Sequence, residues 1–289
     1  MKKVKILLAS LVFIVSCSSQ NSLNDDLKKL ENSSKIAPPK ELSKVYENTI
    51  DTNISDDFSS LDKTKWTYRK PDKLTGDSEK YVSIVDNSYL SIKCDVKDKK
   101  GGGISGLNYC RFGFFITKFR IRGIQENGPK SHTHPAIWGN RYNMGVDGRR
   151  APVEGNDYME LDWVEYYAWS KKNCWDIDAP PDLDGVRHKE LISVMLEHDV
   201  KTKFGDWETV GLEFNPDYMQ AWEYVNGQWQ KLGRKVPAGD VQTRDTMKRT
   251  CFQNMHWILS NGYFGHAKGS DQDSWLDVDY FYYFPLKNK

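Results

Sequence analysis

Three acidic side chains, Glu160, Asp162 and Glu165, lie within six consecutive residues of an otherwise apolar and aromatic run. Buried like charges repel one another and lose their hydration, so a purely structural strand gains nothing from them. In a regular strand Glu160 and Asp162 share a face, whereas Glu165 points to the opposite face. One extra residue near Trp163 or Val164, a β-bulge, turns Glu165 back, and bulges are common beside active sites. The spacing therefore predicts three carboxylates in one row.

Such a row suits the chemistry of glycoside hydrolysis. One carboxylate attacks the anomeric carbon, and a second, kept protonated, delivers a proton to the leaving oxygen. Asp162, between the two glutamates, raises the proton affinity of its neighbours or donates a hydrogen bond to the nucleophile, depending on its own charge state. The spacing alone also fits two other structures, an exposed strand whose acids face water and a calcium site built from carboxylate oxygens.

The elements that position this row are expected to be strands. Helix-period patterns are scarce after residue 50, and short alternating runs separated by turn residues recur along the chain. The pair Asn226-Gly227 is a strong signal for a hairpin. We therefore predict an all-β fold, a two-sheet sandwich of jelly-roll type. The runs expected to form strands are residues 81–85, 89–94, 114–122, 207–214, 219–225 and 275–284.

The segment Glu160-Leu161-Asp162-Trp163-Val164-Glu165 resembles the Glu-x-Asp-x-x-Glu signature of glycoside hydrolase family 16. Other pieces resemble that family in the same order, and together they cover nearly the whole chain after residue 57. They are the opening at 58–66, a strand at 113–122, the Pro-Ala-Ile-Trp segment at 135–138, and later strands at 207–227 and 277–280.

The resemblance implies a role for each acid in a retaining double displacement. Glu160 would be the nucleophile, Asp162 its assisting acid and Glu165 the general acid/base. It also implies a curved β-sandwich with an open concave cleft, in which Trp138 is the sugar platform next to the scissile bond. This chemistry requires no cofactor. A structural calcium ion is compatible with the Asp-rich strand ends, although the sequence does not identify its ligands.

Further substrate contacts are expected around these residues. His134 shares a face with Trp138 at period two, so it either reaches the cleft or lies in a surface loop. Trp169, just past the acids, is a second platform or a core residue. Arg141, with Arg149 and Arg150, has the charge to bind sulfate esters.

The substrate is expected to be an algal-type galactan. The family includes enzymes that act on agarose, porphyran, κ-carrageenan and β-1,3-glucan. This sequence has His132-Thr133-His134 before Pro135, where laminarin-cleaving relatives usually carry a tryptophan, and residues 166–169 look more like the galactan-cleaving members. We predict a secreted endo-β-glycosidase acting on agarose, porphyran or carrageenan. The alternatives are an endo-β-1,3-glucanase (laminarinase) and a non-catalytic surface lectin.

The first residues resemble an export signal. Three lysines precede an apolar run from 6 to 15, which is too short to span a bilayer as a permanent helix. The run ends just before Cys17 in a pattern that resembles the lipobox of bacterial lipoproteins, in which the cysteine is lipidated. We expect a signal peptide over 1–16, a flexible tether over 17–49 and the catalytic domain over 50–289, anchored to the outer membrane or cell surface. An ordinary cleaved signal is the alternative.

The cysteine count and the charge balance limit which disulfides and which binding partners are expected. The chain has five cysteines, and lipid on Cys17 leaves Cys94, Cys110, Cys174 and Cys251 for two disulfides or for free, buried thiols. Lys and Arg number 41 against 40 Asp and Glu, so no basic field attracts nucleic acid, and membrane contact is expected only through the lipid. We expect a monomer whose partner is a polysaccharide.

Overall fold

The computed structural model describes residues 36–72, 74–124, 131–140, 160–167, 172–179, 192–193, 204–237, 254–265 and 272–287. Within these ranges the secondary structure is almost entirely strand. Two short helical elements occur, η1 (Lys40–Leu42) and α2 (Ser78–Tyr81). No helix in the described part of the chain is long and apolar enough to cross a membrane.

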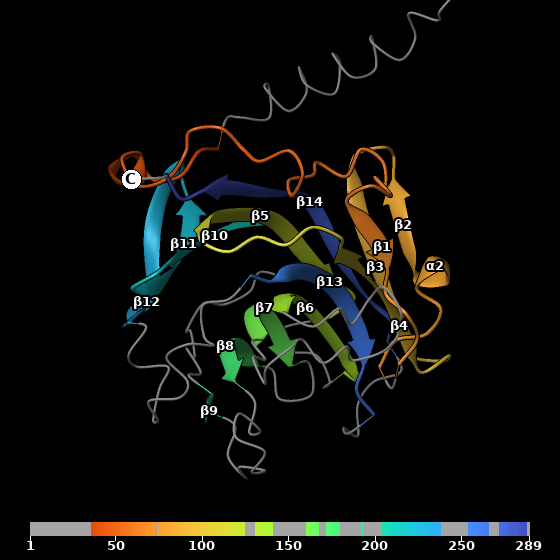
Figure 1. The fold of residues 1–289 in the computed structure, drawn as a ribbon. Coiled ribbons are helices and arrows are strands. Elements are labelled where there is room, and N and C mark those ends of the chain that lie inside the picture. The colour runs from red at the N-terminus through yellow and green to blue at the C-terminus, as the bar shows by residue number, and fades with distance from the viewer. Residues whose placement is uncertain are drawn as a thin grey trace, which may run out of the picture. The chain divides into compact units, whose positions relative to one another are not determined.

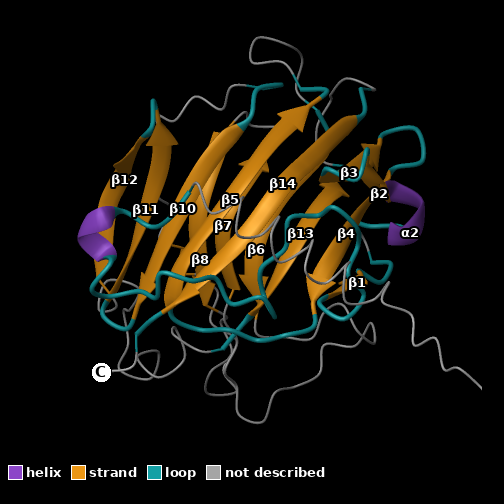
Figure 2. Ribbon diagram, turned by 90° about the horizontal axis from the view of Figure 1, so that it is seen from above, coloured by secondary structure: helices purple, strands orange, loops and turns teal. Residues whose placement is uncertain are grey.

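The strands form one continuous hydrogen-bonded sheet that curls over itself, so its two halves pack as the two sheets of a sandwich (Figure 1). One, the β5 sheet, has the order β12-β11-β10-β5-β14-β3, with β2 on β3; the other, the β7 sheet, has the order β4-β13-β6-β7-β8-β9, with β1 on β4. Every pairing between these strands is antiparallel, and Figure 2 shows neighbouring strands side by side. The predicted all-β sandwich is confirmed.

The strands of the β5 sheet are β2 (Val82–Val85), β3 (Tyr89–Asp95), β5 (Gly113–Arg122), β10 (Glu208–Asn215), β11 (Tyr218–Val225), β12 (Gln228–Pro237) and β14 (Ser274–Pro285). Those of the β7 sheet are β1 (Trp66–Tyr68), β4 (Lys100–Gly106), β6 (Thr133–Asn140), β7 (Glu160–Tyr167), β8 (Lys172–Ala179), β9 (Ile192–Ser193) and β13 (His256–Tyr263). All six strands expected from alternation are present.

An aromatic cluster in the core joins the two sheets. The ring of Trp257 on β13 lies 4.8 Å from Phe115 on β5 and 5.2 Å from Phe281 on β14, centroid to centroid. Trp163 on β7 lies 5.6 Å from Trp257. All four rings are buried, at distances where aromatic pairs attract one another. This packing fixes the inner face of β7, so its other face turns away from the core.

The sheets meet where β3 pairs with β4 through Cys94 and Gly101. A Cβ atom on Gly101 would lie 1.7 Å from the carbonyl oxygen of Asn261 on β13, and one on Gly103 would lie 2.9 Å from the carbonyl oxygen of Leu259. The glycines of β4 therefore let its backbone approach the backbone of β13 more closely than residues with side chains would allow.

The folded body begins before the expected boundary at Ile50. Residues 38–289 form one compact unit. Tyr46 is fully buried, and its hydroxyl donates a hydrogen bond to Glu213 at 3.3 Å. The expected tether is therefore wrong for residues 38–49, because one aromatic anchor in a polar stretch gives no periodic signal.

Cys94 and Cys110 are free and buried, and burial raises the pKa of both thiols. Two disulfides among the four remaining cysteines would use both Cys94 and Cys110, so the two-disulfide alternative is wrong. The alternative of free, buried thiols holds for Cys94 and Cys110. Cys17, Cys251 and the side chain of Cys174 lie outside the described part of the chain.

Candidate active site

Strand β7 carries the three acids, and its pairing with β6 contains the expected bulge. Val164 pairs with Ile137 and Asp162 pairs with Trp138, which leaves Trp163 as an extra residue on β7. Trp163 and Val164 are neighbours in the chain, yet both belong to the hydrophobic core. This is possible in a bulge, because two residues of one strand lie opposite one residue of its partner. The bulge predicted near these residues is confirmed.

The bulge brings the positions of the three acids to one face. Residues directly opposite one another in an antiparallel pair share a face, and the alternating β6 residues 136, 138 and 140 share a face with one another. Positions 160, 162 and 165 therefore line the side of β7 that is turned away from the core. The pairs are Glu160 with Asn140, Asp162 with Trp138 and Glu165 with Ala136.

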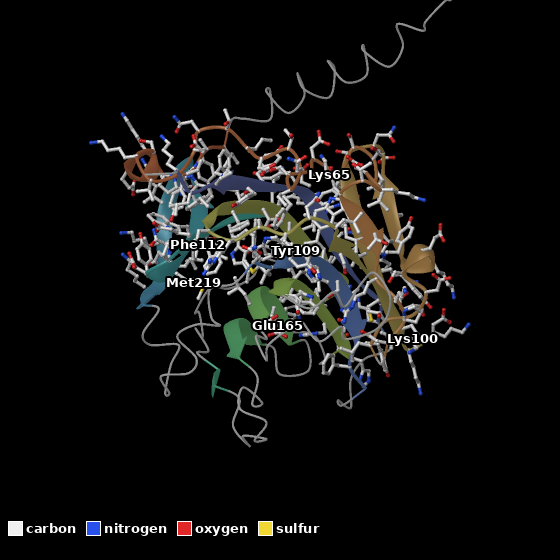
Figure 3. The ribbon with its side chains drawn as sticks, viewed as in Figure 1. Lys65, Lys100, Tyr109, Phe112, Glu165 and Met219 are labelled. Carbon is white, nitrogen blue, oxygen red and sulfur yellow. The ribbon has the colours of Figure 1, made fainter. Side chains whose placement is uncertain are left out.

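The carboxyl groups of Asp162 and Glu165 are both largely buried, with 7% of each residue exposed. Glu165, labelled on β7 in Figure 3, has its Oε1 atom 2.6 Å from Nε2 of His134. Its Oε2 atom is buried, with no hydrogen-bond partner among the described residues. The side chain of Glu160 lies outside the described part of the chain. His134 thus lies on the acid face and contacts the expected acid/base.

Trp138 lies on the same face, opposite Asp162, but its ring is covered. Only 7% of the residue is exposed, and its indole N–H donates to the Ser260 hydroxyl at 3.1 Å. The guanidinium carbon of Arg69 lies 5.2 Å from the ring centroid, a cation–π contact. A sugar could stack on this ring only after Arg69 moved, or on the ring's other side.

Arg69 follows β1 and is itself buried. Its guanidinium donates to Asp72 at 2.7 Å. Burial alone would raise the pKa of Asp72, but Arg69 and hydrogen bonds from Thr75 and Leu74 bring it below its usual value. Sequence reasoning missed Arg69 because β1 is only three residues long and shows no alternation.

His256 on β13 also belongs to this face, because it pairs with Asn140 of β6. The side chain is 1% exposed, and neither ring nitrogen has a hydrogen-bond partner among the described residues. Burial lowers the pKa of His256 to about 4. Its ring meets Tyr109 edge-on at 5.4 Å. Sequence reasoning missed this neutral histidine, since β13 is buried at nearly every position and gives no period-two pattern.

Other predicted site residues cannot be placed. Arg141, Arg149, Arg150 and Trp169 lie outside the described part of the chain. Tyr166, from the stretch compared with galactan-cleaving enzymes, is buried against Phe204 in the core. Within the described ranges, no group of three acidic, histidine or cysteine side chains is arranged to hold a metal ion.

Known proteins resemble this chain in fold. No family model matches the sequence, and no curated protein matches it. Among solved structures, the κ-carrageenase of Pseudoalteromonas carrageenovora in complex with a κ-carrageenan oligotetrasaccharide is 13% identical, covers 82% of this chain and 95% of its own, and has a TM-score of 0.56.

Two further solved structures match at similar coverage. The catalytic domain of an endo-1,3-β-glucanase (laminarinase) from Thermotoga petrophila is 15% identical over 81% of this chain and 97% of that one, with a TM-score of 0.52. An immunostimulatory antigen and pseudo β-1,3-glucanase of Mycobacterium tuberculosis is 21% identical over 80% of this chain and 98% of that one, with a TM-score of 0.56. The chain thus has the curved jelly-roll fold of these proteins.

Proposed function

We propose that this chain is a retaining endo-β-glycosidase of glycoside hydrolase family 16. Glu160 is the nucleophile, Asp162 the assisting acid and Glu165 the general acid/base. The observation that carries the proposal is the bulge at Trp163, which aligns positions 160, 162 and 165 on the outer face of β7. That the same fold occurs in a κ-carrageenase and a laminarinase supports it.

The proposed reaction runs in two steps. In the first, a carboxylate oxygen of Glu160 bonds to the anomeric carbon while Glu165 protonates the leaving glycosidic oxygen, and the glycosidic bond breaks. In the second, Glu165 removes a proton from water, whose oxygen displaces Glu160 from the sugar. Asp162, between them, raises the proton affinity of its neighbours when it is ionised, or donates a hydrogen bond to Glu160 when it is protonated. No cofactor takes part.

We propose an algal-type galactan as substrate. His134 occupies the β6 position where laminarin-cleaving relatives carry tryptophan, and it lies on the acid face. Arg141 directly follows the end of β6 at Asn140, close in sequence to this face, where a guanidinium suits a sulfate ester. The κ-carrageenase match supports this choice.

Two other functions have an observation in their favour. An endo-β-1,3-glucanase is supported by the laminarinase match. A non-catalytic carbohydrate-binding protein is supported by the match to a pseudo β-1,3-glucanase.

A reducing-end assay on agarose, porphyran, κ-carrageenan, laminarin and lichenan tests these functions together. Release from a galactan alone supports the proposal, and release from laminarin alone supports the glucanase. Glu160→Ala is the control, because it removes the nucleophile from a position whose backbone pairing stays the same. Binding to a polymer without release would establish the lectin alternative and refute the enzyme.

We also propose that the protein is exported and held at the cell surface by lipid on Cys17, after removal of residues 1–16. Membrane fractionation and metabolic labelling with a radioactive fatty acid test this. Label is expected in the wild type and absent in Cys17→Ser, whereas a labelled Cys17→Ser variant would contradict the anchor.

A further inference from the structure

Glu165 contacts a histidine on the neighbouring strand. The Nε2 atom of His134 on β6 lies 2.6 Å from Oε1 of Glu165 on β7, and the side chains are 12% and 8% exposed, respectively. A histidine this close to a carboxyl group, shielded from water, holds it more strongly than an exposed histidine does.

The bulge produces this contact. Glu165 pairs directly with Ala136, so His134, two residues along β6, is its diagonal neighbour. Diagonal neighbours in a sheet are within reach when the side chains are long, and the small side chain of Ala136 leaves the space between them open. Without the extra residue Trp163, Glu165 would point to the core and could not meet His134.

A second side chain contacts the imidazole of His134. The ring of Phe264, just after β13, meets it at 4.7 Å between centroids and 69° between planes. The β6 backbone at His134 is paired with Gly262 of β13. Backbone pairing and ring contact therefore fix the direction in which His134 approaches Glu165.

The two carboxyl oxygens of Glu165 have different surroundings. Oε1 faces His134, whereas Oε2 is buried with no hydrogen-bond partner among the described residues. A general acid must have one oxygen that can turn to the leaving group once substrate is bound, and a carboxyl group that rotates loses part of its effect.

We propose that His134 is a positioning residue for the general acid/base: its imidazole holds Oε1 of Glu165, so that Oε2 carries the transferable proton. This inference rests on the proposed function. In the first step the proton leaves Oε2 for the leaving oxygen, and in the second Oε2 takes a proton from water. His134 neither gains nor loses a proton in the cycle.

Kinetics of His134→Leu and His134→Gln test the inference on the polymer that the wild type cleaves. His134→Leu is expected to lower kcat by about tenfold to a hundredfold with little change in KM, because the acid loses its orientation. His134→Gln, which retains an N–H donor, is expected to recover most of the rate.

A second substrate separates proton delivery from a structural defect. On the 2,4-dinitrophenyl glycoside of the same sugar repeat, kcat/KM of His134→Leu is expected to stay within about threefold of the wild type, since kcat/KM reports the first step and that leaving group departs without a proton. His132→Leu is the matched control, because it makes the same change two residues earlier on a ring that contacts Tyr263 instead. An equal loss on both substrates, or no loss on the polymer, would overturn the inference.

A spectroscopic measurement needs no substrate. In the full chain labelled with ¹⁵N-histidine, the imidazole N–H of His134, identified by its absence in His134→Gln, is expected to be protected from exchange and to shift in Glu165→Ala. A signal that does not change in Glu165→Ala refutes the contact. If the wild type cleaves no polymer but this signal shifts, the proposed function and the proton-delivery role fail together while the contact stands.

Discussion

The two glutamates of the site have different proposed roles, and added azide distinguishes them. In Glu165→Ala, azide can attack the glycosyl-enzyme on the face where water normally attacks, so the glycosyl azide is expected to keep the configuration of the substrate. In Glu160→Ala, azide occupies the space of the nucleophile, and the product is expected to be inverted. Product configuration is read by NMR with an activated aryl glycoside as substrate.

Both variants should lose polymer hydrolysis by at least about a hundredfold while their melting temperatures stay close to that of the wild type. The same product configuration from both variants would show that the roles are assigned wrongly.

Buried His256 makes stability depend on pH. Its pKa in the folded state is about 4, lowered by burial from an ordinary value of 6.5. A lowered pKa means that stability is complete above pH 6.5 and decreases as the pH falls towards 4, by roughly 3 kcal/mol. Urea unfolding between pH 7 and pH 4 should show this decrease, and the decrease should be absent in His256→Gln.

Asp56 changes stability in the opposite direction over an overlapping range. Burial raises its pKa from 3.8 to about 6, so its contribution is complete below pH 3.8 and is lost as the pH rises through 6. The prediction for His256 therefore concerns the difference between the wild-type and His256→Gln curves. Parallel curves would contradict it.

At the residue scale, the sequence predicted which side chains share a face of one strand. It did not predict contacts between residues on strands that are distant in the sequence. Glu160, Asp162 and Glu165 required a bulge to share a face, and the bulge is at Trp163. The contact of Arg69 with the ring of Trp138 joins residues 69 positions apart, and no spacing rule connects them.

At the scale of elements, strands that show alternation or a hairpin signal were predictable, whereas β4 and β13, which show neither, were not. β11 and β12 join through Asn226-Gly227, both at positive φ as the hairpin signal requires. β13 is buried at nearly every position, so its sequence shows no alternation. β4 begins Lys-Gly-Gly-Gly, which favours a loop in isolation, and only the backbone of β13 beside it explains why it is a strand.

The glycines of β4 give a prediction about the junction of the sheets. Gly101→Ala would place a Cβ 1.7 Å from the Asn261 carbonyl oxygen, so the strands must separate, and we expect a loss of more than about 3 kcal/mol or failure to fold. Gly106→Ala on the same strand is the matched control, because its nearest neighbour, a Trp257 backbone atom, lies 3.4 Å away. That change is expected to alter stability by less than about 1 kcal/mol.

Urea denaturation of both variants measures the difference. Equal stabilities would mean that β4 and β13 do not approach as closely as described.

At the scale of the whole molecule, the limits of the domain depend on contacts between residues 38–49 and the C-terminal strand, where the Glu47 N–H donates to the Pro285 carbonyl at 2.8 Å, and on Tyr46. Tyr46 packs against Phe114 at 6.0 Å between ring centroids and donates to the buried carboxylate of Glu213, which also accepts a hydrogen bond from Tyr218. Composition suggested a polar tether here, and these contacts outweigh composition because the backbone pairs with the C-terminal strand and the ring covers apolar surface and a charged group at once.

Removing residues 1–49 should therefore weaken the folded domain. The truncated chain exposes Phe114 and leaves Glu213 with one hydroxyl partner fewer, so we expect a loss of roughly 3 to 5 kcal/mol relative to a chain that begins at residue 36. In the longer chain Tyr46→Ala should lose less than the truncation, because the backbone hydrogen bonds to the C-terminal strand remain, and Tyr46→Phe should lose only the side-chain hydrogen bond, about 1 to 3 kcal/mol. Urea unfolding ranks the four proteins. If the truncated chain is as stable as the longer one, the contacts of residues 38–49 do not hold this part of the chain to the domain.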